Sequence, residues 1–228
     1  MQNTARKSCV LILGLLTLLL VAGCDDDDPV VFPDDRISSP DEFIDQFKST
    51  LVARDIEALE PLFDHDTNRF TFYFKDEDVE RLSLPTSVLK MEEMIQVWRN
   101  IFSGQEILNS TGDLVPGITG FEVNRLERNT NWTGPEDGDP SWYDIKYNIQ
   151  KVFYRIEFTV IRNGGHPPLS FEGYLGFHVR PPCGGESFPE DCQGYALHGI
   201  EDGTWSGAQE GGMSFGAFVC QYFTIEEQ

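Results

Sequence analysis

Three segments in the first half of the chain have the hydrophobic spacing of amphipathic helices. In the clearest, from 91 to 102, apolar residues recur every three or four positions and polar residues fill the opposite face. Its apolar side chains are Met91, Met94, Ile95, Trp98, Ile101 and Phe102. Another begins at Ser39-Pro40-Asp41-Glu42, a capping box with proline at the first helical position. A third, shorter segment follows Asp55, which can cap it.

After Gly104 the pattern changes to the alternation of β-strands. It predicts strands over 120–128, 142–163, 170–180 and 194–201, an earlier strand over 69–74 and an edge strand over 218–225. The segment 142–163 is long for one strand, and its apolar residues change parity near Gln150-Lys151. This change predicts a bulge or a tight turn at that point.

Helices followed by a run of strands predict an α+β fold, with three N-terminal helices packed on a curved antiparallel sheet. About 190 residues from Arg36 onward suit a single domain. We place that domain at 39–228, with a glycine-rich stretch over 207–216 in its C-terminal extension.

This order of elements resembles the nuclear transport factor 2-like superfamily, also called cystatin-like cone folds. The resemblance rests on the helix pair Asp41–Phe63, the strand Phe70–Phe74, the helix Met91–Phe102 and the strands from Phe121 to Gly199. It implies a cone-shaped domain, which serves both enzymes and non-catalytic binding domains. Steroid isomerases of this superfamily carry a tyrosine in the first helix. Residues 41–63 contain none, so no catalytic residue is carried over.

Two other folds remain open at this point. A lipocalin-like barrel is disfavoured by three early helices, and a new α+β sandwich would fit the same order of elements.

The N-terminus has the pattern of a secretion signal. Arg6 and Lys7 precede an uncharged apolar run over 9–22, which is shorter than the roughly 20 residues of a membrane span. The run ends in Val21-Ala22-Gly23-Cys24, which resembles the lipobox of bacterial lipoproteins. In that family the cysteine receives acyl chains such as palmitate and becomes the first residue of the mature chain.

The resemblance implies a signal peptide over 1–23 and a lipid anchor on Cys24. The mature domain would then be extracytoplasmic, in the cell envelope or periplasm, and anchored to the inner or the outer membrane. Sorting rules for the residues after the cysteine conflict here, so the choice of membrane stays open. An ordinary secretory signal with an incidental cysteine, or an uncleaved anchor, are the alternatives.

Charge limits the partners. The chain has 38 acidic and 17 basic residues, a net charge of −21 at pH 7. Such an acidic chain does not suit nucleic acid, whose phosphates require a basic surface. Residues 24–38 include Asp25-Asp26-Asp27-Asp28 and two prolines, which favours a disordered, self-repelling tether.

The remaining cysteines suit an oxidising compartment. Cys183 and Cys192 bracket a loop with turn-forming residues at both ends, and we expect a disulfide between them. Cys220 lies in an apolar segment and is expected to be a buried structural residue rather than a nucleophile.

Few residues suggest chemistry. Asp76, His178 and His198 are the candidate acid–base groups, and we prefer to interpret them as a surface acid and two hydrogen-bonded strand histidines. The segment from Asp64 to Lys75 begins like a calcium loop but lacks the glycine and the bidentate glutamate that such a loop requires. The four histidines have no zinc-like spacing, so we predict no metal and no cofactor.

The sequence therefore favours a non-catalytic lipoprotein that binds a small apolar ligand, or a partner protein of the envelope. The alternative is an enzyme doing acid–base chemistry on a small hydrophobic substrate in the same cone. Pairing into a homodimer through the sheets is a further expectation, from the resemblance alone. A carboxylate or imidazole inside the pocket would distinguish the enzyme from the binding protein.

Overall fold

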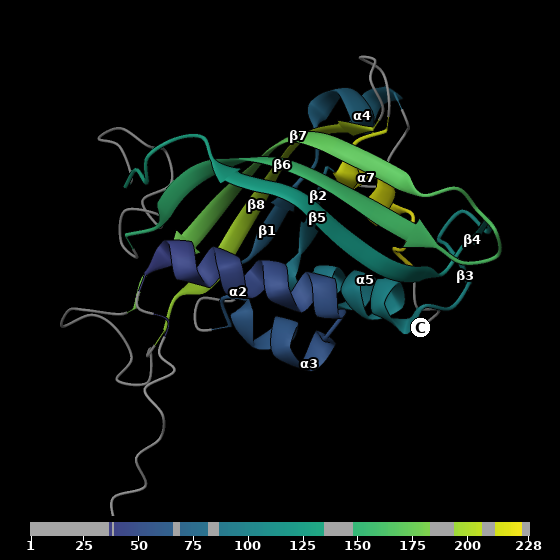
Figure 1. The fold of residues 1–228 in the computed structure, drawn as a ribbon, viewed down its shortest axis with the longest axis horizontal. Helices are drawn as coiled ribbons and strands as arrows, with labels where there is room; N and C mark the ends of the chain where they lie inside the picture. The colour runs from purple at the N-terminus through teal and green to yellow at the C-terminus, as the bar shows by residue number, and fades with distance from the viewer. Residues whose placement is uncertain are drawn as a thin grey trace, which may run out of the picture. The chain divides into compact units, whose positions relative to one another are not determined.

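The alternating segments in the second half of the chain form most of a six-stranded sheet in the computed structural model (Figure 1). The strands lie in the order β2-β1-β8-β7-β6-β5. Their bounds are β1 Thr71–Tyr73, β2 Val88–Lys90, β5 Ile118–Arg128, β6 Gln150–Arg162, β7 Leu169–Arg180 and β8 Ala196–Ser206. A separate hairpin consists of β3 Ile107–Leu108 and β4 Leu114–Val115.

The structure describes residues 37, 39–65, 69–81, 87–134, 148–182, 194–206 and 213–224. The chain divides into two units, Met1–Arg36 and Ile37–Gln228. All described residues belong to the second unit, and their buried apolar side chains form one hydrophobic core. Within the described ranges, no helix is long and apolar enough to cross a membrane.

The sheet is mixed rather than antiparallel, which corrects the sequence prediction. Four neighbouring pairs of strands are antiparallel, but β1 runs parallel to β8, with Phe72 opposite Ile200. The alternation of side chains predicts that a segment is a strand, but it carries no information on which strand becomes its neighbour. The pairing of β1 with β8 depends on the whole chain that connects them.

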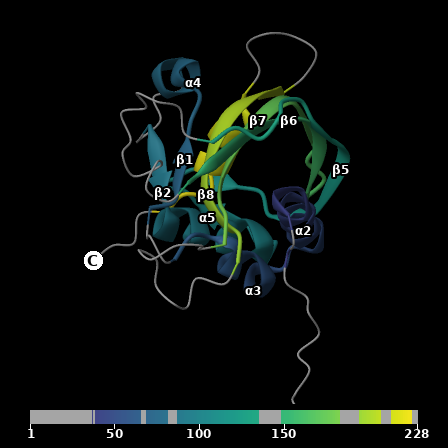
Figure 2. The ribbon, with the colours of Figure 1, turned by 90° about the vertical axis from the view of Figure 1, so that its left-hand side faces the viewer.

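Irregular pairing curves the sheet, as Figure 2 shows. The register of β5 shifts between Ile118 and Gly120 and again between Val123 and Arg125, and the β7–β8 pair shifts after His178. Such bulges bend a strand and increase its twist. The parity change predicted near Gln150 falls where β6 begins, just after Asn148, whose φ of 50° is left-handed.

The described residues hold five α-helices, two more than the sequence predicted. They are α2 Pro40–Ala53, α3 Ile56–Leu59, α4 Asp76–Arg81, α5 Met91–Ser103 and α7 Phe215–Cys220, and a 3-10 turn, Glu60–Leu62, continues α3. In Figures 1 and 2, α2, α3 and α5 lie along the open side of the curved sheet. The arrangement is an α+β fold with helices on the concave side of a curved sheet.

The C-terminal segment forms a helix where the sequence predicted an edge strand. Ser214 caps α7, since its Oγ accepts a hydrogen bond from the Ala217 amide at 3.0 Å. Phe215, Phe218 and Tyr222 are buried at a spacing of three and four residues. That spacing is helical, but it starts only at the end of the glycine-rich stretch, where few residues remain to show a period.

Helix α5 supplies much of the core. All six residues of its predicted apolar face are buried, and Val97 is buried with them. The Trp98 ring is fully buried and contacts the rings of Phe102, Phe121 and Phe215 at centroid distances of 5.4 to 6.3 Å. The core thus joins α5 to both the sheet and α7.

Candidate functional site

A cavity of about 40 Å³ lies between α2 and the inner, concave face of the sheet. It exceeds the volume of about 10–15 Å³ that one water molecule needs. Its lining comes from α2, β5, β6, β7, β8 and α7. The lining residues are Phe47, Lys48, Leu51, Phe121, Val123, Leu126, Ile156, Phe158, Leu175, Phe177, Ile200 and Phe215. Lys48 alone among them carries a polar side-chain group.

Strand alternation explains why the lining is apolar. Leu175 and Phe177 share one parity on β7, and Ile156 and Phe158 share one on β6, so all four point to the inner face. Aromatic rings meet edge to face around the space. The ring centroids of Phe177 and Phe47 are 5.7 Å apart, and those of Phe158 and Phe215 are 4.7 Å apart. In both pairs the ring planes are nearly perpendicular. Edge-to-face packing of rigid rings stabilises these walls.

The mouth of the cavity lies along α2 and the edge strand β5. Eight of the lining residues are buried, whereas Lys48 and Leu51 on α2 and Val123 and Leu126 on β5 are partly exposed. Because β5 ends the sheet, no strand from the described part of the chain covers this side. The seam between α2 and β5 is therefore where a ligand would enter.

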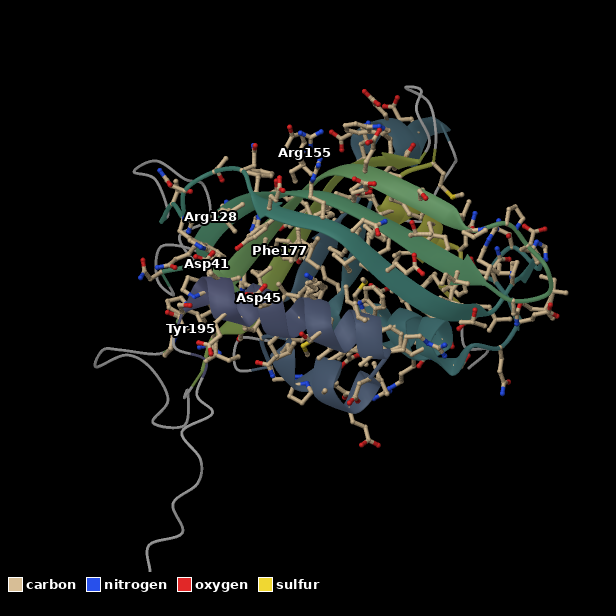
Figure 3. All side chains as sticks on the ribbon, in the orientation of Figure 1. Asp41, Asp45, Arg128, Arg155, Phe177 and Tyr195 are labelled. Carbon is tan, nitrogen blue, oxygen red and sulfur yellow. The ribbon has the colours of Figure 1, made fainter. Side chains whose placement is uncertain are left out.

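A polar cluster around Asp41 holds α2 at one end of this seam. One carboxylate oxygen of Asp41 accepts hydrogen bonds from the Tyr154 hydroxyl at 2.7 Å and the Trp132 indole at 2.9 Å. The other accepts from the Arg128 guanidinium at 2.8 Å. In Figure 3, Asp41 and Arg128 lie at the same end of α2, and Asp45 lies further along the helix.

The cluster shifts the acidity of its members. Partial burial by itself would raise the pKa of Asp41, but the hydrogen bonds from Tyr154 and Trp132 and the charge of Arg128 outweigh it and hold that pKa below its ordinary value. Burial and the bond to Asp41 raise the pKa of Tyr154. Asp41 is therefore a carboxylate and Tyr154 a neutral donor at neutral pH.

Helix α2 is also fixed at its C-terminal end. Arg54, which ends it in a left-handed conformation, donates from Nη2 to the Phe102 carbonyl oxygen at 2.8 Å. Asn163, after β6, donates to the Gly104 carbonyl oxygen at 3.2 Å. With both ends held, α2 crosses the mouth in a fixed position.

None of the three acid–base candidates lines the cavity. Asp76 is an exposed residue at the start of α4. His178 is buried, and its Nε2 lies 2.6 Å from Glu201 Oε1. This hydrogen bond, more than any other cause, lowers the pKa of Glu201. By parity, His178 points to the outer, convex face of the sheet, opposite to Phe177.

His198 belongs to a buried charged cluster that the sequence did not reveal. Its Nδ1 lies 3.0 Å from Asp64 Oδ2, and Arg180 Nε donates to Asp64 Oδ1 at 2.9 Å. All three residues are less than a tenth exposed. Asp64 is 116 residues from Arg180 and 134 from His198, so no local pattern could bring them together. These surroundings are those of a hydrogen-bonded structural histidine.

A second buried acid, Asp202, positions α7 and hence one wall of the cavity. Its carboxylate accepts hydrogen bonds from the Thr204 amide and hydroxyl and from the Gly216 amide, at 2.7 to 3.1 Å. Burial raises the pKa of Asp202, although these hydrogen bonds oppose the shift. Since Gly216 follows Phe215, the contact places the Phe215 ring in the lining.

The cysteines add no chemistry in the part of the chain that the structure describes. Cys220 is buried and free, and burial raises the pKa of its thiol to about 11, so it remains protonated and unreactive at neutral pH. Cys24, Cys183 and Cys192 lie outside the described residues. Among those described, no group of three or more His, Cys, Asp or Glu side chains is arranged to hold a metal ion.

The comparisons with known proteins show similarity of fold alone. No family model and no curated protein matches the chain. A conserved protein from Planctomyces limnophilus is 8% identical over 72% of this chain and 91% of its own, with a TM-score of 0.41. A nuclear transport factor 2-like superfamily protein from Salmonella enterica is 11% identical over 75% and 89%, also at 0.41.

A further similar structure is a nuclear transport factor 2-like protein of unknown function in nutrient uptake from Rhodospirillum rubrum. It is 11% identical over 70% of this chain and 92% of its own, with a TM-score of 0.38. None of these similarities assigns a function or a functional residue to this chain.

Proposed function

We propose that the domain binds a small apolar ligand in the cavity between α2 and the sheet, without catalysing a reaction on it. The observation that carries this proposal is the lining, which is made of aromatic and aliphatic side chains with Lys48 at the mouth. An apolar concavity with few polar groups is the usual form of a small-molecule site. The fixed ends of α2 keep that concavity preformed.

The alternative, an acid–base enzyme, lacks its reacting groups at this site. Such an enzyme needs a carboxylate or an imidazole against the apolar wall. The lining contains no Asp, Glu or His, and His178 and His198 are each hydrogen-bonded to an acid elsewhere. The cavity therefore supports binding better than catalysis.

Native mass spectrometry tests this proposal. Residues 37–228 should retain the mass of a small apolar molecule after purification, or gain one on incubation with medium-chain alcohols. A Val123→Trp variant, which fills the mouth with a large ring, should lose that mass while keeping its circular dichroism spectrum. A wild-type spectrum that shows only the bare protein in both conditions would contradict the proposal.

We also propose that the chain is lipid-anchored through Cys24 in a bacterial envelope. This rests on the sequence alone: the basic head, the apolar run and Val21-Ala22-Gly23-Cys24. In a bacterial host, a clickable palmitate analogue should label the full chain in the membrane fraction, and Cys24→Ala should abolish the label. Equal labelling of both chains would refute the anchor.

The predicted disulfide between Cys183 and Cys192 stays a proposal of the same kind. Its basis is the oxidising compartment that the signal implies and the short loop between the two residues. Alkylation of the unfolded, unreduced chain should modify neither cysteine, and prior reduction should expose both. Modification without reduction would exclude the bond.

The outer face of the sheet supports a second candidate function, pairing with another copy of this chain. Tyr73, Glu201, Gly176 and Phe153 lie in register across β1, β8, β7 and β6, so they share this face. Tyr73, Phe153 and the neighbouring Tyr174 are each about 40% exposed, so this face carries three partly exposed aromatic rings, and apolar surface gathered on one face favours association. Analytical ultracentrifugation should show a dimer that Phe153→Ser dissociates, and a monomeric wild type would exclude it.

A further inference from the structure

Among the described residues that line the cavity, Lys48 is the one that carries a charge. Among the described residues its ammonium group makes no hydrogen bond or ion pair. By contrast, Lys75 pairs with Glu77 at 3.2 Å, and Lys90 donates to the Thr71 hydroxyl at 3.1 Å.

The position of Lys48 relates this charge to the cavity. It follows Phe47 on α2 and belongs to the lining, yet it is partly exposed, as are Leu51, Val123 and Leu126 around the mouth. A lysine in such a place covers apolar surface with its methylene stem and keeps its ammonium group in water. An anion held at the mouth by a tail in the cavity would therefore meet this ammonium group.

The size of the cavity limits the shape of the tail. Its volume of about 40 Å³ is far below the roughly 300–1,000 Å³ of sites that enclose drug-sized molecules. The rings of Phe47, Phe158, Phe177 and Phe215 form close-packed walls that cannot yield to a fused-ring ligand without repacking. The enclosed space admits only the end of a slender, unbranched chain, and the rest of that chain would lie along the apolar residues of the mouth, Leu51, Val123 and Leu126.

We infer that the ligand is a straight-chain fatty acid anion, with the end of its alkyl tail in the cavity, the rest of the tail along the apolar residues of the mouth and its carboxylate at Lys48 in the seam between α2 and β5. This inference rests on the proposed binding function of the same cavity and adds the chemical class of the ligand. A carboxylate would form a charge-assisted hydrogen bond with the ammonium group, which a neutral or cationic head cannot form. Because the chain has a net charge of −21, it repels anions in general. Lys48 supplies the local positive charge that an anion needs in order to bind at this place.

Octanoate, 1-octanol and octylammonium have the same chain length and differ in their head group. Comparing them separates the contribution of the head group to binding from that of the tail. Isothermal titration of residues 37–228 should give about tenfold tighter binding for octanoate than for octanol, as expected for one charge-assisted hydrogen bond. Octylammonium should bind most weakly. Lys48→Gln should weaken octanoate about tenfold and leave octanol unchanged, and Lys48→Arg should restore the preference.

Two controls make the result specific. Lys75→Gln removes the same charge from a lysine outside the lining, so it should leave the order of the probes unchanged. Val123→Trp should weaken octanoate and octanol together, because it blocks the tail rather than the head.

The outcomes distinguish the two proposals. If octanol binds as tightly as octanoate, or Lys48→Gln leaves the preference intact, the assignment of an anionic ligand is wrong although the cavity still binds apolar molecules. If no probe binds the wild type, or Val123→Trp binds all probes like the wild type, the proposed function fails and this inference fails with it.

Discussion

Asp41 connects the first turn of α2 to the sheet. It accepts hydrogen bonds from Tyr154 on β6, Arg128 on β5 and Trp132 in the loop after β5. Tyr154 is almost fully buried, so its hydroxyl would lose its partner without Asp41. A single side chain thus joins the first turn of α2 to two strands at one end of the mouth.

Asp41→Ala should lower the free energy of unfolding by about 1–2 kcal/mol, because hydrogen bonds to a charged group are lost and a buried donor is left unpaired. Urea denaturation measures the change. Asp45→Ala removes the same charge one turn further along α2, where the side chain has no hydrogen-bond partner among the described residues, and should cost much less. Equal losses in the two variants would show that the cluster does not hold the helix.

The effect of Asp41 should also depend on pH. Its folded pKa lies below the ordinary value of 3.8, so the unfolded chain takes up the proton first as the pH falls. The stabilisation is therefore fully present above about pH 5 and is lost as the pH falls through the folded pKa. The difference between wild type and Asp41→Ala should shrink between pH 5 and pH 2, and a constant difference would contradict the assignment.

Among the elements, α7 shows how a short helix depends on contacts distant in sequence. It has six residues, too few to be stable alone, and its position follows from Asp202 on β8. The Thr204 hydroxyl also accepts a hydrogen bond from the Phe215 amide at 2.7 Å. These contacts place Phe215 against Trp98 and Phe158 and complete the cavity wall.

Asp202→Ala should lower the free energy of unfolding by about 2–4 kcal/mol, since it leaves the buried Gly216 and Thr204 amides without an acceptor. It should also weaken binding of octanoate, because Phe215 loses its fixed position. Asp76→Ala, at an exposed acid outside the site, should change neither quantity. Thermal unfolding and titration calorimetry measure the two effects, and a stable Asp202→Ala protein with unchanged binding would contradict this role.

The sequence predicted those elements whose residues form a pattern over a few neighbouring positions. It did not predict those features that depend on contacts between distant parts of the chain. The apolar face of α5 and the Ser39 cap of α2 follow from residues within a few positions of each other. Tyr154 is 113 residues from Asp41, and their hydrogen bond had no signature in the sequence. The parallel pairing of β1 with β8 and the helical C-terminus were missed for the same reason, because distant parts of the chain decide them.

The sequence predicted what kind of site the domain has but not where its residues lie. An apolar interior followed from the alternation along the strands, and the interpretation of His178 and His198 as hydrogen-bonded strand histidines agrees with their contacts to Glu201 and Asp64. The place of Lys48 at the mouth could not be read from the sequence, because α2 and β5 are about 70 residues apart and only their packing forms the seam.

At the scale of the whole domain, three features produce the cavity together. Bulges curve the sheet, α2 crosses its open side with both ends held, and α7 closes the far wall. The net charge of the chain, −21, repels anions in general. A slender apolar chain entering beside Lys48 is what this combination accepts.

The most direct test is methyl NMR of residues 37–228 titrated with octanoate. The structure predicts saturable shifts of the methyl groups that line the cavity, those of Val123, Leu126, Ile156, Leu175 and Ile200, while those of the core residues Leu59 and Leu89 stay in place. The absence of shifts up to the solubility limit of octanoate, or shifts confined to residues outside this lining, would contradict a ligand-binding cavity.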